Sequence, residues 1–237
     1  MGTKRITLFA GHYGSGKTNI AINYARYLKR CVTQKVTIAD LDIVNPYFRT
    51  KDSAKELQAE DIDLVVSEFA NSNVDFPALP KEIYALVAPH PSSPIPHPSS
   101  PIPHPFVVMD IGGDDRGALA LGRYVPDIKA EGDYEMLAVV NAARPLTPDV
   151  AGTVEVLREI EAACQLPFTG LVNNTNLGQE TRAQDVLGSL GYADGVAAAM
   201  EIPVRFTSAD ERLMPELQGR VPDLFPLKLQ RLYYHLA

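Results

Sequence analysis

Near its start the chain reads Gly11-His12-Tyr13-Gly14-Ser15-Gly16-Lys17-Thr18, which fits the pattern GxxxxGK[ST]. An apolar run, Ile6–Ala10, comes directly before this octapeptide, and a helical pattern begins at Lys17. Glycines at this spacing let backbone N–H groups converge on phosphate oxygens, and the helix that follows presents its positive end to them. The octapeptide therefore predicts a phosphate-binding loop (P-loop) between a strand and a helix.

Two side chains of the P-loop have expected roles. Lys17 reaches the β- and γ-phosphate oxygens of a nucleoside triphosphate and is a candidate catalytic residue, and the Thr18 hydroxyl ligates magnesium. Nucleotide contacts are expected along the whole segment, from Gly11, His12, Tyr13, Gly14, Ser15, Gly16, Lys17, Thr18 and Asn19.

Apolar runs of strand length alternate with helical patterns along the chain. Strands are predicted at Ile6–Ala10, Val36–Ala39, Leu64–Val66, Phe106–Met109, Met136–Val140, Gly170–Val172 and Val204–Phe206. Helices are predicted at Lys17–Arg30, Arg116–Tyr124, Pro148–Ala163, Glu180–Leu190 and Leu227–Leu236. This alternation predicts an α/β fold with a doubly wound, mostly parallel sheet and helices on both faces, as one domain over residues 1–237.

The composition narrows the class of protein. The chain has 237 residues, of which 46% are hydrophobic and 22% charged, as is usual for a soluble α/β domain. A net charge of −7 argues against nucleic acid as the primary partner, because no basic surplus is present to neutralise phosphates.

Cysteine usage and hydropathy bear on the compartment. Cys31 and Cys164 form no CxxC pair, which predicts no metal cluster and suggests a reducing compartment. No apolar run is long enough for a transmembrane segment, and the first residues read as a strand and not as a signal peptide. We therefore expect a cytoplasmic protein.

Acidic residues close two of the predicted strands. Asp110 follows Phe106–Met109 and opens Asp110-Ile111-Gly112-Gly113, and Asp40-Leu41-Asp42 follows the second strand. Ligands of parallel sheets bind at the carboxyl ends of the strands, so Asp110 is a candidate magnesium ligand and Gly113 lets the backbone approach a γ-phosphate. The alternative is that these aspartates only form turns or helix caps.

Together, Gly11–Thr18, Asp40-Leu41-Asp42 and Asp110-Ile111-Gly112-Gly113 resemble the three signatures of SIMIBI-class P-loop ATPases, and in that class the MinD/ParA and CobQ/CobB family. The resemblance covers nearly the whole chain in element order. It implies that Thr18 and Asp110 hold Mg²⁺ and that Asp40 or Asp42 positions the attacking water. It also implies a nucleotide-dependent homodimer, in which a lysine after the first glycine reaches the partner's phosphates. His12 stands at that position here.

Asparagines follow the predicted strand Gly170–Val172, where this class reads the base. GTPases carry NKxD there, and Asn176 stands in the place of the aspartate that accepts from both guanine donors. An amide offers one acceptor and one donor, which favours adenine and therefore ATP. Asn173 and Asn174 are expected nucleotide contacts, with Asn173 the better candidate for the base. The alternative is that the asparagines cap the next helix.

Two further features carry weaker signals. Arg49, Arg116 and Arg144 could add positive charge near the site, although exposed surface arginine is the default. The apolar stripe in Leu227–Leu236 predicts a helix that packs on the sheet, with a MinD-like membrane-targeting helix as the alternative.

Residues 89–105 form a low-complexity insert. His-Pro-Ser-Ser-Pro-Ile-Pro occurs twice, from His90 to Pro103, and prolines at this density prevent helix and sheet. A tolerated duplication is the first interpretation, and a proline-motif docking site is the second.

Three functions fit the sequence. The first is a magnesium-dependent ATP-binding protein and slow ATPase that switches its affinity for a protein partner with the bound nucleotide. The second is a small-molecule phosphoryl-transfer enzyme, as in the CobB-like and dethiobiotin-synthetase branches. The third is a module that binds nucleotide without turnover.

Overall fold

The computed structural model describes residues 2–42, 53–66, 81–89, 105–113, 119, 121–145, 147 and 149–229. Within these ranges one sheet of eight strands has the order β3-β2-β4-β1-β5-β6-β7-β8, and every neighbouring pair is parallel. The strands are β1 (Ile6–Ala10), β2 (Val36–Leu41), β3 (Ile62–Val66), β4 (Phe106–Ile111), β5 (Tyr134–Val140), β6 (Gly170–Asn173), β7 (Val204–Asp210) and β8 (Leu224–Leu227). The predicted fold class is confirmed.

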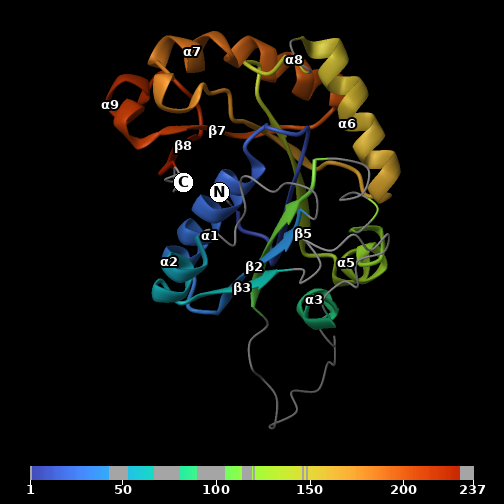
Figure 1. Ribbon diagram of the computed structural model, residues 1–237. Helices are drawn as coiled ribbons and strands as arrows, with labels where there is room; N and C mark the ends of the chain where they lie inside the picture. The colour runs from blue at the N-terminus through green and yellow to red at the C-terminus, as the bar shows by residue number, and fades with distance from the viewer. Residues whose placement is uncertain are drawn as a thin grey trace, which may run out of the picture.

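Helices cover both faces of the sheet (Figure 1). On one face lie α1 (Lys17–Cys31) and α2 (Ala54–Ala59), and on the other α3 (Lys81–Val87), α5 (Val125–Glu131), α6 (Val150–Cys164) and α8 (Leu190–Met200). Beyond them, near β7 and β8, are α7 (Ala183–Gly188), α9 (Met214–Leu217) and the 3₁₀ turns η2 (Gly178–Glu180) and η3 (Glu211–Leu213).

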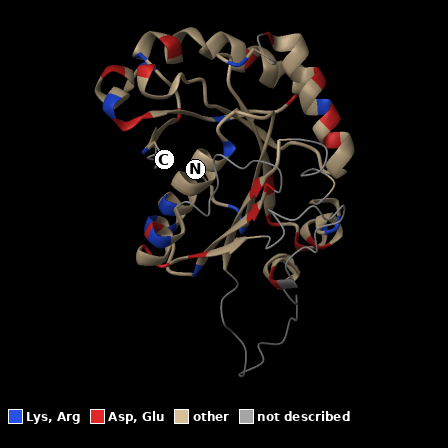
Figure 2. Ribbon diagram, viewed as in Figure 1, with Lys and Arg blue, Asp and Glu red and all other residues tan. Residues whose placement is uncertain are grey.

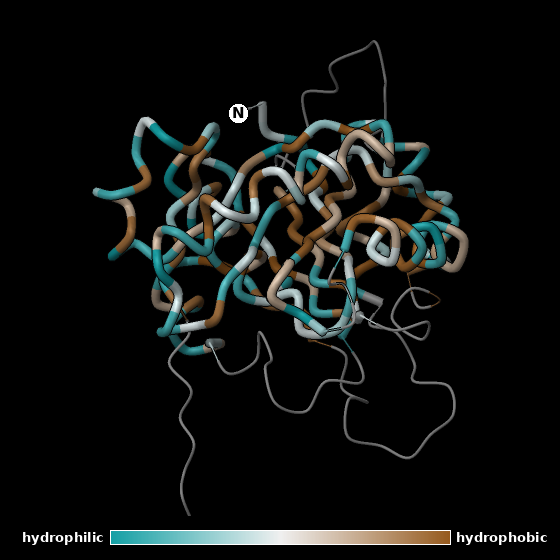
Figure 3. The backbone as a smooth tube through the Cα atoms, turned by 90° about the horizontal axis from the view of Figure 1, so that it is seen from above, coloured by the Kyte–Doolittle hydropathy of each residue, from teal (hydrophilic) through white to brown (hydrophobic). Residues whose placement is uncertain are grey.

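Burial explains why these apolar runs form strands. All residues of β1 and β2 are buried, as expected for parallel strands covered on both faces. Helix α1 packs on Phe9 and its neighbours in the sheet with apolar residues at helical spacing, Ile20, Ala21, Tyr24 and Leu28. Figure 3 shows the hydrophobic segments running through the interior and the hydrophilic ones mostly around it. No helix in the described part of the chain is long and apolar enough to cross a membrane.

Two predicted helices need correction, and a third is confirmed in part. The helix predicted from Leu227 is wrong at its start, because Phe225 and Leu227 are buried on either side of the exposed Pro226, which is the two-residue period of a strand. Residues 230–237 lie outside the described residues. The predicted helix Glu180–Leu190 is divided into η2 and α7, and α8 follows it. Of the predicted helix Arg116–Tyr124, residues 116–118 and 120 lie outside the described part, Leu119, Leu121 and Gly122 are helical as predicted, and a turn leads to α5 at Val125.

Both ends of the insert are fixed at the amino-terminal edge of the sheet. The residues that precede the insert are held by the buried Arg5, which donates from Nη1 to the carbonyl of Leu86 (2.8 Å) and from Nη2 to the carbonyl of Ala88 (3.2 Å). After it, the N–H of Phe106 donates to the carbonyl of Lys35 (2.8 Å), which starts the pairing of β4 with β2. Residues 90–104 themselves lie outside the described residues.

We predict that deleting His90–Pro103 leaves the domain folded. The cut lies before β4, whose first residue, Phe106, is about 13 Å along the strand from Asp110. A shorter surface loop changes closure entropy by only about 1 kcal/mol. The melting temperature, followed by circular dichroism, should therefore shift by less than about 4 °C. Arg5→Ala is the contrasting variant, because it removes a buried side chain with several partners and should lower the melting temperature more. A larger drop for the deletion than for Arg5→Ala would show that the insert folds onto the domain.

Candidate nucleotide-binding site

The predicted P-loop joins β1 to α1, as the sequence indicated. Gly11 leaves β1 against the backbone of Val139 on β5, and Gly16 caps α1 with φ 92° and ψ 23°. That left-handed conformation suits glycine, and a Cβ at Gly16 would also overlap the side-chain nitrogen of Asn174. The loop is closed by a hydrogen bond from the N–H of Ser15 to the carbonyl of His12 (3.2 Å).

Lys17 and Gly113 meet across the loop. The Lys17 side chain is buried, and its Nζ donates to the carbonyl of His12 (3.2 Å). A Cβ placed at Gly113 would lie 2.8 Å from Lys17 Nζ and 2.7 Å from the backbone nitrogen of Tyr13. Only a glycine fits this approach, so the segment after β4 lies directly against the P-loop.

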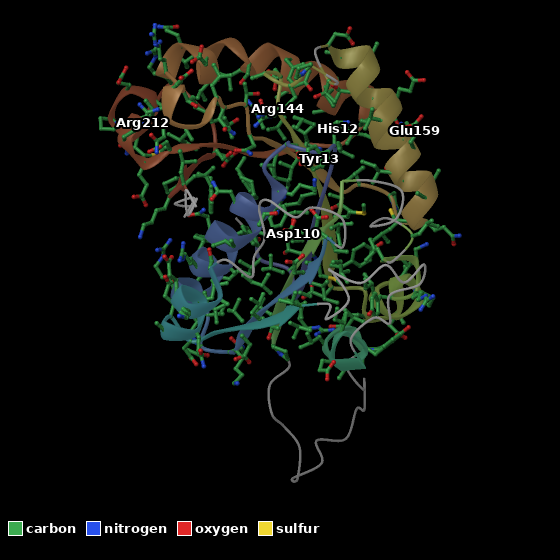
Figure 4. The ribbon with its side chains drawn as sticks, in the orientation of Figure 1. His12, Tyr13, Asp110, Arg144, Glu159 and Arg212 are labelled. Atoms are coloured by element: carbon green, nitrogen blue, oxygen red, sulfur yellow. The ribbon has the colours of Figure 1, made fainter. Side chains whose placement is uncertain are left out.

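Two acidic residues lie side by side below the loop. Asp40 on β2 and Asp110 on β4 are register partners, and Asp110 is also the partner of Phe9 on β1. Since Ile38 and Val108, two residues earlier, pack on the α1 face, the strand alternation directs both aspartates to the face on which α1 begins. Figure 2 shows acidic residues in the strands at the centre of the sheet, and Figure 4 shows Asp110 there.

The donor set fits a magnesium ion held with a nucleotide. Asp110 and Thr18 are both buried, and they offer a carboxylate and a hydroxyl, which are hard oxygen ligands. Within the described ranges no group of three or more His, Cys, Asp or Glu gathers as a metal site. Mg²⁺ needs no such group, because it takes one or two carboxylates and completes its shell with phosphates and water.

Asp42 and Asn19 occupy supporting positions. Asp42 is buried, and its N–H donates to Oδ1 of Asp40 (3.0 Å), so the chain turns around the Asp40 carboxylate as it leaves β2. Asn19 accepts from Nδ2 of Asn23 with both its carbonyl (2.8 Å) and its side-chain oxygen (3.3 Å). Its side chain thus lies along α1.

The asparagines after β6 bind protein groups. Asn173 is fully buried, donates to Ser189 Oγ (2.9 Å) and accepts from the N–H (3.2 Å) and hydroxyl (2.9 Å) of Thr175. Asn174 donates from Nδ2 to the carbonyl of Ser15 (2.7 Å) and accepts from Ser208 Oγ (2.8 Å). Asn173 therefore holds its own loop, and Asn174 connects the P-loop to β6 and β7.

Sequence reasoning missed Asn141, the buried residue directly after β5. Its Nδ2 donates to the carbonyl of Asn176 (3.2 Å), and its Oδ1 accepts from the N–H groups of Asn176 (3.3 Å) and Ala143 (3.0 Å). Asn141 thereby joins the loops after β5 and β6. An asparagine at the end of an apolar run was the signal that could have identified it, as it did for Asn173.

The outer side of the P-loop is formed by His12, Tyr13 and Gly14. His12 Nδ1 lies 2.8 Å from the carbonyl of Tyr13, and the Tyr13 side chain is 53% exposed. Arg144, from the loop between β5 and α6, lies beside Gly14. Figure 4 labels Arg144 together with His12 and Tyr13 in this part of the molecule. Arg49 and Arg116 lie outside the described residues.

Comparison with known proteins finds similarity in fold. No protein-family model matches the sequence, and no curated protein is similar to it. Among solved structures, FtsY from Mycoplasma mycoides has a TM-score of 0.56 at 18% identity, and the match covers 88% of this chain and 62% of that one. Chloroplast FtsY from Physcomitrella patens has a TM-score of 0.56 at 16% identity, covering 87% of this chain and 59% of that one.

A third structure, the signal recognition particle receptor FtsY from Elizabethkingia anophelis in complex with GDP, has a TM-score of 0.51 at 16% identity. The match covers 98% of this chain and 62% of that one, so the chain spans about three fifths of the length of these structures. These similarities show an α/β fold like that of P-loop NTPases. The resemblance to the SIMIBI class as such rests on the sequence motifs. The closer resemblance to MinD and ParA rests on the sequence motifs alone and stays a prediction.

We predict that Asn174→Asp destabilises the fold. A carboxylate cannot donate to the carbonyl of Ser15, so a buried acceptor loses its partner at a cost of about 1–3 kcal/mol. Urea unfolding of the nucleotide-free protein should show this loss in the free energy of unfolding. Ser208→Ala is the contrasting variant: it leaves the bond to Ser15 and removes the donor to Oδ1 of Asn174, so it measures the other side of the bridge. Equal stability of Asn174→Asp and the unmodified protein would contradict the bridging role.

Proposed function

We propose that this chain is a magnesium-dependent ATP-binding protein and a slow ATPase that acts as a nucleotide-controlled switch for a protein partner. The observation that carries the proposal is the approach of Gly113 to Lys17 Nζ and to the backbone nitrogen of Tyr13. A terminal phosphate held by Lys17 would lie against the backbone after β4. Gain or loss of that phosphate would then act directly on the residues that follow Gly113.

Each polar group of the site has a role in this proposal. Lys17 places its charge on the β- and γ-phosphates, and Thr18 and Asp110 hold Mg²⁺, which when bound neutralises phosphate charge. Asp40 or Asp42 orients the attacking water. Their burial supports these roles, because charges act more strongly on a phosphate where bulk water is excluded.

The proposed nucleotide-dependent switch includes the stretch from Asp40 to Arg49, of which residues 43–49 lie outside the described residues. Helix α2, later in the chain, is tied to α1 by Arg26, whose Nη2 lies 2.9 Å from Glu56 and whose Nε lies 2.7 Å from Glu60.

The proposed base is adenine. The FtsY structure from Elizabethkingia anophelis contains GDP, so guanine is the competing base. In this chain Asn176 donates to the carbonyl of Asn174 (2.7 Å) and accepts from the N–H of Gly178 (3.1 Å). Two guanine donors would need a carboxylate where this amide stands.

The proposed assembly is a nucleotide-dependent homodimer of single-domain subunits in the cytoplasm, as the MinD/ParA resemblance implies. Exposure of Tyr13 and Arg144 beside the P-loop leaves that face accessible to a second copy. The protein partner would then distinguish the two nucleotide states.

Lys17→Ala is the direct test of nucleotide binding. Removing the ammonium group should weaken Mg·ATP binding by about 10–150-fold, the range for a charge-assisted hydrogen bond, with the fold intact. Isothermal titration with Mg·ATP measures the affinity, and circular dichroism checks the fold. Asp110→Asn is the companion variant and should make binding less dependent on added Mg²⁺.

Unchanged ATP affinity in a folded Lys17→Ala protein would overturn the assignment of the site. ATP consumption that requires a small metabolite would replace the switch with phosphoryl transfer. Binding without any turnover would leave a nucleotide-binding module.

Competition between ATP and GTP tests the base. Because the Asn176 amide presents one acceptor, guanine leaves a donor unpaired, and ATP should bind more tightly by about tenfold or more. Displacement of a fluorescent ATP analogue by each nucleotide gives the ratio. Asn176→Asp should move the ratio toward GTP. Tighter binding of GTP to the unmodified chain would contradict the proposed adenine preference.

A further inference from the structure

Arg144 packs on the P-loop from the β5 side. A Cβ placed at Gly14 would lie 3.7 Å from Nε, 3.9 Å from Cδ and 4.0 Å from Cζ of Arg144, so the Arg144 side chain lies close beside the loop, where an added methyl group would touch it. Gly113 approaches the neighbouring Tyr13 from the β4 side. Residues 13 and 14 are therefore flanked on both sides, by a glycine backbone and by a cation.

This contact lies at the terminal-phosphate end of the loop. Gly113 touches both Tyr13 and Lys17 Nζ, the group that reaches the β- and γ-phosphates. The other end of the loop, at Ser15 and Gly16, is held by Asn174 from the loop after β6. Arg144 thus stands on the side where a triphosphate and a diphosphate differ.

The backbone that carries Arg144 is fixed. Its N–H donates to the carbonyl of Asn141 (3.2 Å), and its carbonyl accepts from the N–H of Thr147 (3.1 Å). Ala142, in the same turn, donates to Thr175 Oγ1 (3.1 Å). The turn is thus bound to the end of β6, and the arginine is presented from a defined position, which lowers the cost of ordering it around a ligand.

The guanidinium itself has no ion pair with any residue that the structure describes, and the side chain is exposed. Other arginines at functional or packing positions are paired, such as Arg26 with Glu56 and Arg205 with Glu135. Within the P-loop octapeptide, Lys17 is the single Lys or Arg. A forked donor beside the loop would therefore add a second permanent cation for phosphate oxygens.

We propose that Arg144 contacts the terminal phosphate of the nucleotide bound to its own chain and so distinguishes a triphosphate from a diphosphate. The inference rests on the proposed nucleotide site and adds to it a residue outside the sequence motifs. The group that Arg144 would contact is the γ-phosphate, because ATP carries that group at this end of the loop and ADP does not.

Titration of ATP and ADP into Arg144→Ala tests the inference without any turnover. Mg·ATP affinity should fall about tenfold, as for the loss of one charge-assisted contact, while Mg·ADP affinity should stay unchanged. Arg144→Lys keeps the charge and should recover part of the ATP affinity. The matched control is Arg30→Ala, an exposed arginine near the far end of α1, about 20 Å along the helix from Lys17, which should change neither affinity.

Three results would overturn the inference. Equal weakening of ATP and ADP would show that Arg144 does not act on the terminal phosphate, and no weakening would show that it makes no contact. A defect that appears only as the protein concentration rises would place the arginine on a second chain's nucleotide. If the unmodified chain itself binds no ATP, the proposed function fails first. If Lys17→Ala loses tight ATP binding and Arg144→Ala keeps it, the proposed nucleotide site stands and only the role of Arg144 is overturned.

Discussion

The site depends on the parallel pairing of β1 with β4 on one side and β5 on the other. Three loops therefore leave the sheet at one edge and side by side: the P-loop after β1, the glycine segment after Asp110, and the turn that carries Arg144. The carboxyl ends of parallel strands lie at the same edge of the sheet. Strands β2, β3 and β4 lie on one side of β1 and strands β5 to β8 on the other, so the strand order changes direction at β1. Any rearrangement of these three strands would separate Lys17 from Gly113.

Side-chain amides hold these loops where the backbone cannot. Loops at a sheet edge have no ladder partners, so their polar groups need other ones. Asn141 and Asn174 supply them, joining the loop after β5 to that after β6 and joining the latter to the P-loop. An amide suits this work, because it donates and accepts from one planar group. The P-loop is thus held in place before any ligand arrives, which favours tight binding.

Local patterns predicted the fold well where they were long or chemically specific. The octapeptide and the buried runs of β1, β2 and β4 were identified because glycine spacing and continuous apolar stretches have few other interpretations. The strand at Leu224–Leu227 was missed because a four-residue run with Pro226 resembles a helical stripe when joined to the leucines after it. The hydrogen bond of Asn174 to Ser15 and the approach of Arg144 to Gly14 bring together residues about 160 and 130 positions apart, and no single-sequence pattern encodes such pairings.

The register that places Asp40 opposite Asp110 has a consequence for the life of the protein in the cell. Like charges directly across two strands oppose folding, and here both carboxylates are buried. A cation bound at the proposed site would offset that repulsion, so the ligand-free chain should then be the less stable form. Proteases act on transiently opened chains, and abundance would then follow the supply of nucleotide and magnesium. Two buried acidic residues at the proposed nucleotide site would thereby also couple the half-life of the protein to the cell's supply of nucleoside triphosphate.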